Sequence, residues 1–311
     1  MRRYATSKST TPYILTPSAA KSASNVKFLD ASWFMPNSTR HAREEFLSKR
    51  IPGAQFLDLD EVASPHELGL KHMMPSNQVF AEACEKFGVE PSSHVVLYDT
   101  HGVFSSPRAL FMFRSFGHSN SSIIDGGLPR WETEGLPLTS EPAETPKPTE
   151  YQVPAVDVKS HTLCDPGRLK FSGDMIAKSY EASELVLDAR SKGRFLGTNP
   201  EPRPGLSSGH MPNSMSLPFN IFLRKNSYAG GEYTTFLPVP ELRKALVEAV
   251  GEERTQAILN GSLLVTTSCG SGMTAAVLWL GLKMLGVAEV SLYDESWTGY
   301  AMRADSPIQK A

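Results

Sequence analysis

The stretch that decides the fold runs from Leu263 to Thr274, with the sequence Leu–Leu–Val–Thr–Thr–Ser–Cys–Gly–Ser–Gly–Met–Thr, and leads directly into the apolar segment Ala275–Leu285. Its first residues are apolar or β-branched, which indicates a buried strand, and the glycines that follow indicate a tight turn. The apolar segment is long enough for a buried helix. A strand that turns into a helix is the building unit of a mainly parallel sheet covered by helices, so the stretch predicts an α/β fold.

The same pattern occurs twice in the chain. Matched segments follow one another in the same order at an offset of roughly 160–170 residues, far longer than the period of a solenoid. The matched pairs are Phe28–Asp30 with Leu185–Asp188, Arg50–Ala54 with His210–Ser214, Val95–Tyr98 with Leu263–Thr267, and Ser122–Asp125 with Val290–Asp294. Helical patterns such as Asn77–Phe87 and Pro107–Phe116 lie between the strands. We therefore predict one duplicated domain, each copy a mainly parallel sheet with helices on both faces.

Four regions are expected along the chain. Residues 1–25 are predicted to be a disordered basic segment, residues 26–140 an N-terminal domain, residues 141–164 a linker and residues 165–311 a C-terminal domain. The linker is expected because its first part is rich in Pro, Thr and Glu and has little apolar periodicity.

The N-terminal segment has the composition of a mitochondrial transit peptide. The first 29 residues contain no Asp or Glu, and they are rich in Ser, Thr and Ala. Their basic residues are Arg2, Arg3, Lys8, Lys21 and Lys27. We expect a mitochondrial protein. The alternative is a cytoplasmic protein with a disordered basic tail, and Pro12 and Pro17 favour it because they weaken an amphipathic helix.

Composition excludes several classes of function. A formal net charge of −2 gives no reason to expect nucleic acid as a direct partner. No apolar run approaches the roughly 20 residues that span a bilayer, so no membrane partner is expected. The cysteines Cys84, Cys164 and Cys269 are far apart and form no CxxC pair, which argues against structural zinc and a disulfide scaffold.

Cys269 differs from the other cysteines because of its position. It lies between a strand and a helix, in a glycine-rich turn whose N–H groups and helix dipole favour an anion such as a thiolate. Gly270 and Gly272 permit the tight backbone path. The matched loop of the first half, Asp99–Ser105, has no cysteine, so chemistry at this loop belongs to the second half. The alternative is that Cys269 is a small buried apolar residue.

A cysteine phosphatase is a poor match to this loop. Such an enzyme needs a cationic fork near the far end of the loop to hold the phosphate. After Cys269 the next Lys or Arg is Lys283, deep in the predicted helix. A single extra sulfur atom fits so small a cradle better than a phosphate does.

Cys269–Gly–Ser–Gly–Met–Thr274 resembles the active loop of the 3-mercaptopyruvate sulfurtransferases of the rhodanese superfamily, usually Cys–Gly–Ser–Gly–Val–Thr. Thiosulfate-preferring rhodaneses typically carry Cys–Arg–Lys–Gly–Val–Thr instead. The resemblance covers nearly the whole chain after about residue 25. It includes the segments Arg50–Ala54, Phe56–Asp60, Asp125–Leu128 with Trp131, Gly193–Gly197, Pro200–Arg203, Ser208–Pro212 and Tyr293–Trp297. The fold that it implies is a tandem pair of rhodanese-like domains, the second of them catalytic.

The resemblance also implies the roles of individual residues. Cys269 would carry the persulfide, and Arg194 and Arg203 would hold the carboxylate and ketone of the substrate. Ser271, Asp60 and His72 would complete the catalytic group. The substrate-binding loop would include Gly270, Gly272, Met273 and Thr274. Since Asp60 and Cys269 lie in different halves, the site is expected in the cleft between the domains.

Taken singly, these residues have plainer interpretations. Asp60 alone is typical of a surface or helix-capping residue, His72 of a surface histidine and Ser271 of a turn former. Arg194 and Arg203 are expected on a loop, where arginines are usually solvated.

Other residues depart from the family pattern or lie outside the predicted site. Glu295 replaces the glycine of the usual Tyr–Asp–Gly–Ser–Trp, Asn213 replaces a glycine, and Met273 replaces a valine; we expect these changes to adjust packing. Arg108 and Arg114 are interpreted as interface or surface residues. Cys84 and Cys164 are expected to play no part in the chemistry.

The expected reaction is a two-step sulfur transfer without a metal or organic cofactor. 3-Mercaptopyruvate would load Cys269 and release pyruvate, and a thiol such as thioredoxin or a small thiol would collect the sulfur; cyanide would give thiocyanate. One alternative is a thiosulfate sulfurtransferase. Another is a relay protein that receives sulfur from a cysteine desulfurase and supplies it for tRNA or cofactor thiolation.

Overall fold

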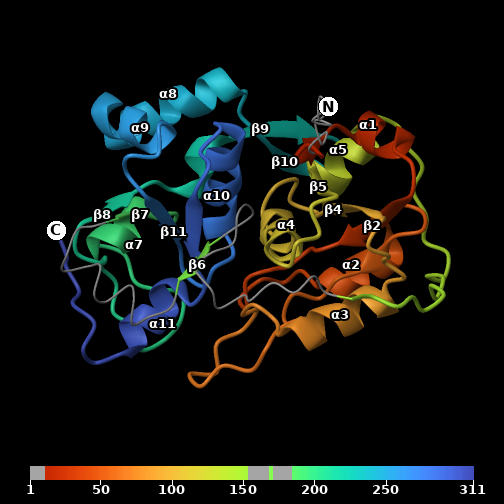
Figure 1. Cartoon of the computed structure of the whole chain (residues 1–311), viewed down its shortest axis with the longest axis horizontal. Helices are drawn as coiled ribbons and strands as arrows, with labels where there is room; N and C mark the ends of the chain where they lie inside the picture. Colours follow the sequence, from red (N-terminus) through yellow and green to blue (C-terminus); the bar gives the residue numbers. More distant parts are fainter. Residues whose placement is uncertain (1–10, 153–167, 171–183) are drawn as a thin grey trace, which may run out of the picture.

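The computed structural model describes residues 11–152, 168–170 and 184–311 of the chain, which form two α/β halves (Figure 1). The first half contains β1 (Ile14–Leu15), β2 (Val26–Asp30), β3 (Gln55–Phe56), β4 (His94–Tyr98) and β5 (Ser121–Ile124), with the helices α1 (Pro17–Ser22), α2 (Ala42–Ser48), α3 (Asn77–Lys86), α4 (Ser106–Ser115) and α5 (Gly127–Thr133). The strands form one parallel sheet in the order β1-β5-β4-β2-β3.

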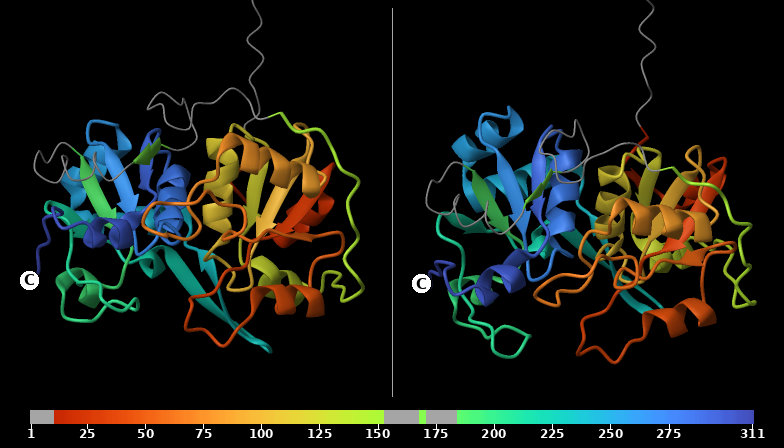
Figure 2. Two further views of the ribbon diagram at one scale, coloured as in Figure 1. Left: turned by 90° about the horizontal axis from the view of Figure 1, so that it is seen from below. Right: turned by 60° about the horizontal axis from the view of Figure 1, so that its bottom comes forward.

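The second half repeats this arrangement. Its parallel sheet has the order β6-β12-β11-β7-β8, the same order as the first sheet once the strands are matched in sequence. The strands are β6 (Arg168–Lys170), β7 (Leu185–Asp188), β8 (Ser214–Ser216), β11 (Val265–Ser268) and β12 (Val290–Tyr293). The helices are α7 (Lys192–Leu196), η1 (Phe219–Phe222), α8 (Val239–Val250), α9 (Glu252–Leu259), α10 (Ala275–Met284) and α11 (Ser296–Met302). The predicted duplication is therefore confirmed (Figures 1 and 2).

Alternation along β4 explains why helices cover both faces of the first sheet. Successive side chains of a strand point to opposite faces. Val95 and Leu97 belong to the cluster that includes residues of α3 and α4. Val96 and Tyr98 belong to a separate cluster that includes residues of α2 and α5. A central parallel strand therefore buries every side chain, which is why it reads as an unbroken apolar run.

The prediction that residues 1–25 are disordered is wrong for the described part of that segment. Ile14 pairs with Ile123 at the edge of the first sheet. The side chain of Thr16 accepts the N–H of Ala19 at 3.2 Å and so caps α1, whose first residue is Pro17. A threonine cap followed by proline is a strong helix start, and the basic composition of the segment obscured it. Residues 1–10 lie outside the described part.

The predicted linker is only partly described. Residues 141–152 run along the first half, where the Tyr151 hydroxyl lies 2.8 Å from Nδ1 of His118 and Thr149 donates to the carbonyl of Val89 at 2.8 Å. The remainder of the predicted linker, with Cys164, lies outside the described residues.

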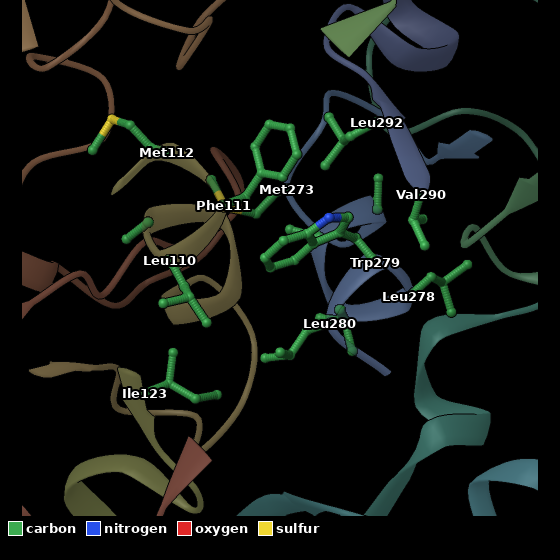
Figure 3. Close-up of a cluster of buried hydrophobic side chains, with 14 of the residues drawn as sticks. Leu110, Phe111, Met112, Ile123, Met273, Leu278, Trp279, Leu280, Val290 and Leu292 are labelled. Carbon is green, nitrogen blue, oxygen red and sulfur yellow. The ribbon is translucent and has the colours of Figure 1, made fainter. Parts of the chain in front are cut away.

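The two halves meet through equivalent helices. α4 follows β4 and α10 follows β11, and the two helices pack against each other. Phe111 of α4 contacts Trp279 of α10 edge-on, with ring centroids 5.2 Å apart (Figure 3). Since each helix begins where the matched loop ends, this contact brings both loops to the domain interface.

A hairpin that the sequence did not predict also connects the halves. It consists of β9 (Leu223–Tyr228) and β10 (Gly231–Phe236), and it extends from the second half to the first (Figure 2). The N–H of Thr234 donates to the carbonyl of His101 at 3.0 Å, and the N–H of Phe236 donates to Asp125 at 2.8 Å. The hairpin therefore holds the first-half loop that matches the Cys269 loop.

Asn213 preserves the turn that glycine forms in the first half. Gly53 has φ +76° and Asn213 has φ +59°, so both lie in the left-handed region. Asparagine is among the few residues other than glycine that adopt this conformation readily. The departure from the family pattern therefore leaves the turn unchanged.

Candidate active site

Cys269 is the first residue after β11 and is 2% exposed. Strand register identifies its counterpart in the first half. Ser268 pairs with Asp188 in the second sheet, and Tyr98 pairs with the matched Asp30 in the first. The residue after Tyr98 is Asp99, so a carboxylate occupies the position of the thiol.

The first-half loop shows that this turn binds an anion. Oδ2 of Asp99 accepts the N–H groups of Phe104, Ser105 and Ser106 at 2.9, 3.1 and 2.9 Å. The Ser106 hydroxyl adds a fourth hydrogen bond at 2.7 Å. The start of α4 and the loop before it therefore form a complete cradle for a negative charge.

The second-half loop offers corresponding donors. Counting back from the first residue of α10, the N–H groups of Met273, Thr274 and Ala275 match the three that hold the Asp99 carboxylate. In the described part of the chain none of these three N–H groups has a hydrogen-bond partner. The donors that a carboxylate occupies in the first half are thus unoccupied in the described part of the second half.

Ser296, which the sequence did not single out, fixes the shape of the loop. Its Oγ accepts the N–H groups of Cys269 and Gly272, each at 3.0 Å, and donates to the carbonyl of Tyr293 at 2.9 Å. The same oxygen lies 3.9 Å from Sγ of Cys269. Ser296 has φ +51°, a strained conformation for a residue other than glycine. In the sequence, Ser296 is distinguished only by its place in the family-like segment Tyr293–Trp297.

Two guanidinium groups lie against the loop. A Cβ atom placed on Gly270 would lie 3.2 Å from Nη2 of Arg194 and 3.5 Å from Nη1 of Arg203. A glycine here leaves room for both cations beside the cysteine. The prediction that Arg194 lies on a loop is wrong, because it is in the short helix α7; Arg203 does lie outside the helices and strands.

Glu201 holds Arg194, a role that was not predicted from the sequence. Its carboxylate is nearly buried and forms ion pairs with Arg194 at 2.5 Å and with Arg190 at 2.7 Å. Arg190 also forms an ion pair with Asp188 at 2.6 Å and lies over the ring of Trp297. The signal available in the sequence was an acidic residue between two prolines, two positions before the candidate substrate residue Arg203.

Arg203, unlike Arg194, is not held by an ion pair among the described residues. Within the described residues it has no ion-pair or hydrogen-bond partner. Its pKa is lowered because it is partly buried and because Arg194 is close; the negative charges of Cys269, Glu201 and Asp60 act in the opposite direction. An arginine stays protonated despite such a shift, so its guanidinium is a charged group that can bind an anionic ligand.

Asp60 and His72 form a pair in the first half. Nδ1 of His72 lies 2.9 Å from Asp60, whose other oxygen accepts the indole N–H of Trp33 at 3.2 Å. Burial by itself would raise the pKa of Asp60, but the hydrogen bond and charge of His72, with Trp33, hold it below its ordinary value. His72 is buried, and its Nε2 has no partner among the described residues. The surface interpretation of His72 is therefore wrong.

A cavity of about 400 Å³ lies between the halves, and Ser271 and Arg203 are the predicted site residues that line it. Its lining does not include Cys269, Arg194 or the Asp60–His72 pair. Ser271 and Arg203 line it from the second half, and Lys71 and Met73 from the first. We find no hydrogen bond between Ser271 and the Asp60–His72 pair within the described part of the chain.

Three further residues lie away from the cavity. The side chain of Met273 packs into the core beside Phe111 and Trp279 (Figure 3), so only its main chain can contact a substrate. Thr274 is half-buried at the start of α10. Cys84 is fully buried, and burial raises the pKa of its thiol well above the ordinary value.

Among the described residues, no helix has the length and apolar character needed to cross a membrane. Nor does any group of three or more His, Cys, Asp or Glu side chains in these ranges lie together in a way that could bind a metal ion.

Comparison with known proteins defines the class of the fold. Residues 19–134 match the family model of the rhodanese-like domain. The crystal structure of SseA from Escherichia coli, described as a 3-mercaptopyruvate sulfotransferase with the rhodanese fold, superimposes with a TM-score of 0.74 at 28% identity, over 92% of this chain and 99% of that one. The two halves are therefore tandem rhodanese-like domains.

Relatives with similar sequences define the enzyme family more narrowly. A probable 3-mercaptopyruvate sulfurtransferase of Schizosaccharomyces pombe is 37% identical over 91% of this chain and 89% of its own length. A mitochondrial thiosulfate/3-mercaptopyruvate sulfurtransferase of Arabidopsis thaliana is also 37% identical, over 92% of this chain and 74% of its own length. The chain belongs to the rhodanese superfamily, within the family of the 3-mercaptopyruvate sulfurtransferases, and is a sulfurtransferase enzyme.

Proposed function

We propose that the enzyme takes sulfur from 3-mercaptopyruvate, carries it as a persulfide on Cys269 and passes it to a thiol. The observation that carries this proposal is the position of Arg194 and Arg203 beside Gly270, next to a cysteine loop with no cation of its own. The donor has one carboxylate and one ketone oxygen, and two guanidinium groups match these two acceptors.

The first step transfers sulfur to the enzyme. The thiolate of Cys269 attacks the sulfur of 3-mercaptopyruvate, an S–S bond forms, and the C–S bond breaks. The electron pair of the broken C–S bond stays with the carbon fragment, which leaves as the enolate of pyruvate. Arg194 and Arg203 stabilise the negative charge on the enolate oxygen. Protonation of the enolate carbon completes pyruvate. The N–H groups of the loop, matched to those that hold Asp99, stabilise the terminal sulfur of the persulfide.

Asp60, His72 and Ser271 are proposed to move the proton between the thiol and the product carbon. The hydrogen bond between Asp60 and His72 supports the first part of this group, because a carboxylate on Nδ1 leaves Nε2 of the ring available. Ser271 is in the cavity without a hydrogen bond to either residue, so its part requires the bound substrate to bridge the gap.

The second step returns Cys269 to its thiol form. We propose that thioredoxin or a small thiol attacks the terminal sulfur and leaves as a persulfide, which a further thiol can reduce to hydrogen sulfide. Cyanide would accept the same sulfur as thiocyanate. The mitochondrial name of the Arabidopsis relative, together with the basic N-terminal segment, supports a mitochondrial location for this chain.

Steady-state rates with two donors test the choice of substrate. We expect kcat/KM for 3-mercaptopyruvate to exceed that for thiosulfate at least tenfold, because a dianionic donor lacks the loop cations that it needs. Cys269→Ser should abolish transfer from both donors, and Cys84→Ala should retain it, since Cys84 is buried away from the cleft. A preference for thiosulfate would refute the proposal that 3-mercaptopyruvate is the donor. Fast loading by a cysteine desulfurase with slow turnover of both donors would favour the relay instead.

A further inference from the structure

Arg108 is a buried cation that the proposed reaction does not use. It lies in the first turn of α4 and is 2% exposed. Its Nη2 donates to the main-chain carbonyl of His72 at 2.8 Å and forms an ion pair with Asp294 of the second half at 2.5 Å. Its Nη1 is buried and has no partner among the described residues. A buried charge with an unsatisfied donor is costly, which makes it a candidate for a functional role.

Asp294 forms the other side of this contact. One carboxylate oxygen binds Arg108, and the other accepts the N–H of Met74 at 2.9 Å. Both oxygens of a second-half residue are therefore bound by the first half. Two residues further along the chain is Ser296, which holds the Cys269 loop.

The ion pair also lies directly behind that loop. A Cβ atom on Gly272 would lie 2.6 Å from the carbonyl oxygen of Asp294 and 3.3 Å from Nη1 of Arg108. Only a glycine, with φ +82°, allows this approach. The unpartnered N–H group of Arg108 thus faces the backbone of the loop that carries Cys269.

These contacts connect the two parts of the proposed catalytic group. The segment His72–Met74 carries the histidine that pairs with Asp60, and the segment Asp294–Ser296 carries the serine that shapes the Cys269 loop. The apolar contact between α4 and α10 holds the halves together but is not directional. The Arg108–Asp294 pair adds directional bonds to both segments, and it does so across the domain interface.

We propose that Arg108 and Asp294 are positioning residues for sulfur transfer, which hold the Asp60–His72 pair in register with the Cys269 loop. This inference rests on the proposed role of Asp60 and His72 in proton transfer. Neither Arg108 nor Asp294 needs to touch the substrate. A shift of about 1 Å between catalytic groups can slow a reaction by about 100-fold, so the effect of losing the pair falls on the rate more than on donor binding.

A double-substitution experiment in the full-length chain tests this inference. The variants are Arg108→Met, Asp294→Asn, Asp60→Asn and each of the first two combined with Asp60→Asn. Persulfide formation is followed in single turnovers over a range of 3-mercaptopyruvate concentrations. We expect Arg108→Met to lower the maximal rate about 10- to 100-fold with less than about a threefold change in the half-saturating concentration. In the Asp60→Asn background the same substitution should cost less than about threefold, because the group that it positions is already lost.

The controls separate positioning from general stability. Arg114→Met removes another buried arginine of α4, one that binds main-chain carbonyls of the first half away from the loop; it should lower the melting temperature and leave the single-turnover rate unchanged. If Arg108→Met does not fold, the isosteric Asp294→Asn answers the same question. Full additivity with Asp60→Asn, or a change in donor affinity alone, would overturn the inference. A wild-type enzyme that loads from thiosulfate instead refutes the proposed donor, and the same cycle is then run with thiosulfate.

Discussion

Replacement of Arg203 by methionine should separate activity from stability. Arg203 lies beside Gly270 and the Cys269 loop, and within the described ranges it has no ion-pair partner. Its pKa is lowered in the folded protein, so folding disfavours its charge. Removal of the charge should therefore leave the melting temperature unchanged or slightly raised. The donor, by contrast, loses charge-assisted hydrogen bonds, each worth about 1.5–3 kcal/mol. We expect kcat/KM for 3-mercaptopyruvate to fall about 10- to 150-fold.

Arg190 provides the matched contrast. It is buried beside Asp188 and Glu201, and these two carboxylates, opposing the effect of burial, raise its pKa. Arg190→Met leaves the buried carboxylate of Asp188 without its ion-pair partner and leaves Glu201 paired with Arg194 alone. Breaking a buried ion pair in this way typically costs about 3–5 kcal/mol. The unfolding midpoint of Arg190→Met in urea should therefore fall sharply, whereas that of Arg203→Met should not. Arg224→Met, which breaks a half-exposed surface pair with Glu241, should change neither activity nor stability.

Donor kinetics and urea unfolding of the three variants show whether Arg203 binds the donor or stabilises the fold. The reasoning is refuted if Arg203→Met unfolds as readily as Arg190→Met, because Arg203 would then be a structural residue. It is equally refuted if Arg203→Met retains full kcat/KM. Arg203→Lys keeps the charge but loses the planar fork, and it should recover only part of the activity.

Three further substitutions test the fold around the site. Ser296→Ala leaves the N–H groups of Cys269 and Gly272 without their acceptor and should destabilise the protein by about 1–3 kcal/mol, measured by urea unfolding, and slow persulfide formation. Trp279→Ala removes the largest side chain of the contact between the halves and should cost about 3–5 kcal/mol. Burial raises the pKa of Asp30 from 3.8 to about 7. The native state thus retains a proton that the unfolded chain releases above pH 4, so wild-type stability should fall between pH 4 and 7. In Asp30→Asn the unfolding free energy should lack the decrease between pH 4 and 7 that Asp30 causes. Identical pH profiles of unfolding free energy for the two proteins would contradict this prediction.

Local sequence was sufficient to predict most of the fold. The strands β4, β7 and β12 are short, mainly apolar runs between turn residues, and such runs in a parallel sheet are buried on both faces. Their repetition in the same order revealed the duplication. The hairpin β9–β10 was missed because its strands are half-exposed, polar and antiparallel. The strand β1 was missed because two residues at a sheet edge carry no periodic signal.

The candidate site was predictable only in part, for a related reason. Cys269 stands out because the strand, the turn and the helix around it are adjacent in the sequence. Ser296 and Arg108 act through bonds to residues far along the chain, and nothing in their own neighbourhoods indicates the partner. Glu201 binds Arg194 and Arg190, which are only 7 and 11 residues away, but no periodic pattern in this Gly- and Pro-rich stretch indicates that pairing. Arg108 illustrates the point: its partner Asp294 is in the other half, and only the packing of α4 against α10 brings them together.

The most direct test is the intact mass of the full-length chain after incubation with 3-mercaptopyruvate and removal of excess donor. We predict a gain of about 32 Da, one sulfur atom, which peptide mapping assigns to Cys269 and which a thiol acceptor removes. The Asp99 cradle of the first half should gain nothing. An unchanged mass with pyruvate released, or sulfur found on Cys84 or Cys164, would contradict a persulfide at the Cys269 loop.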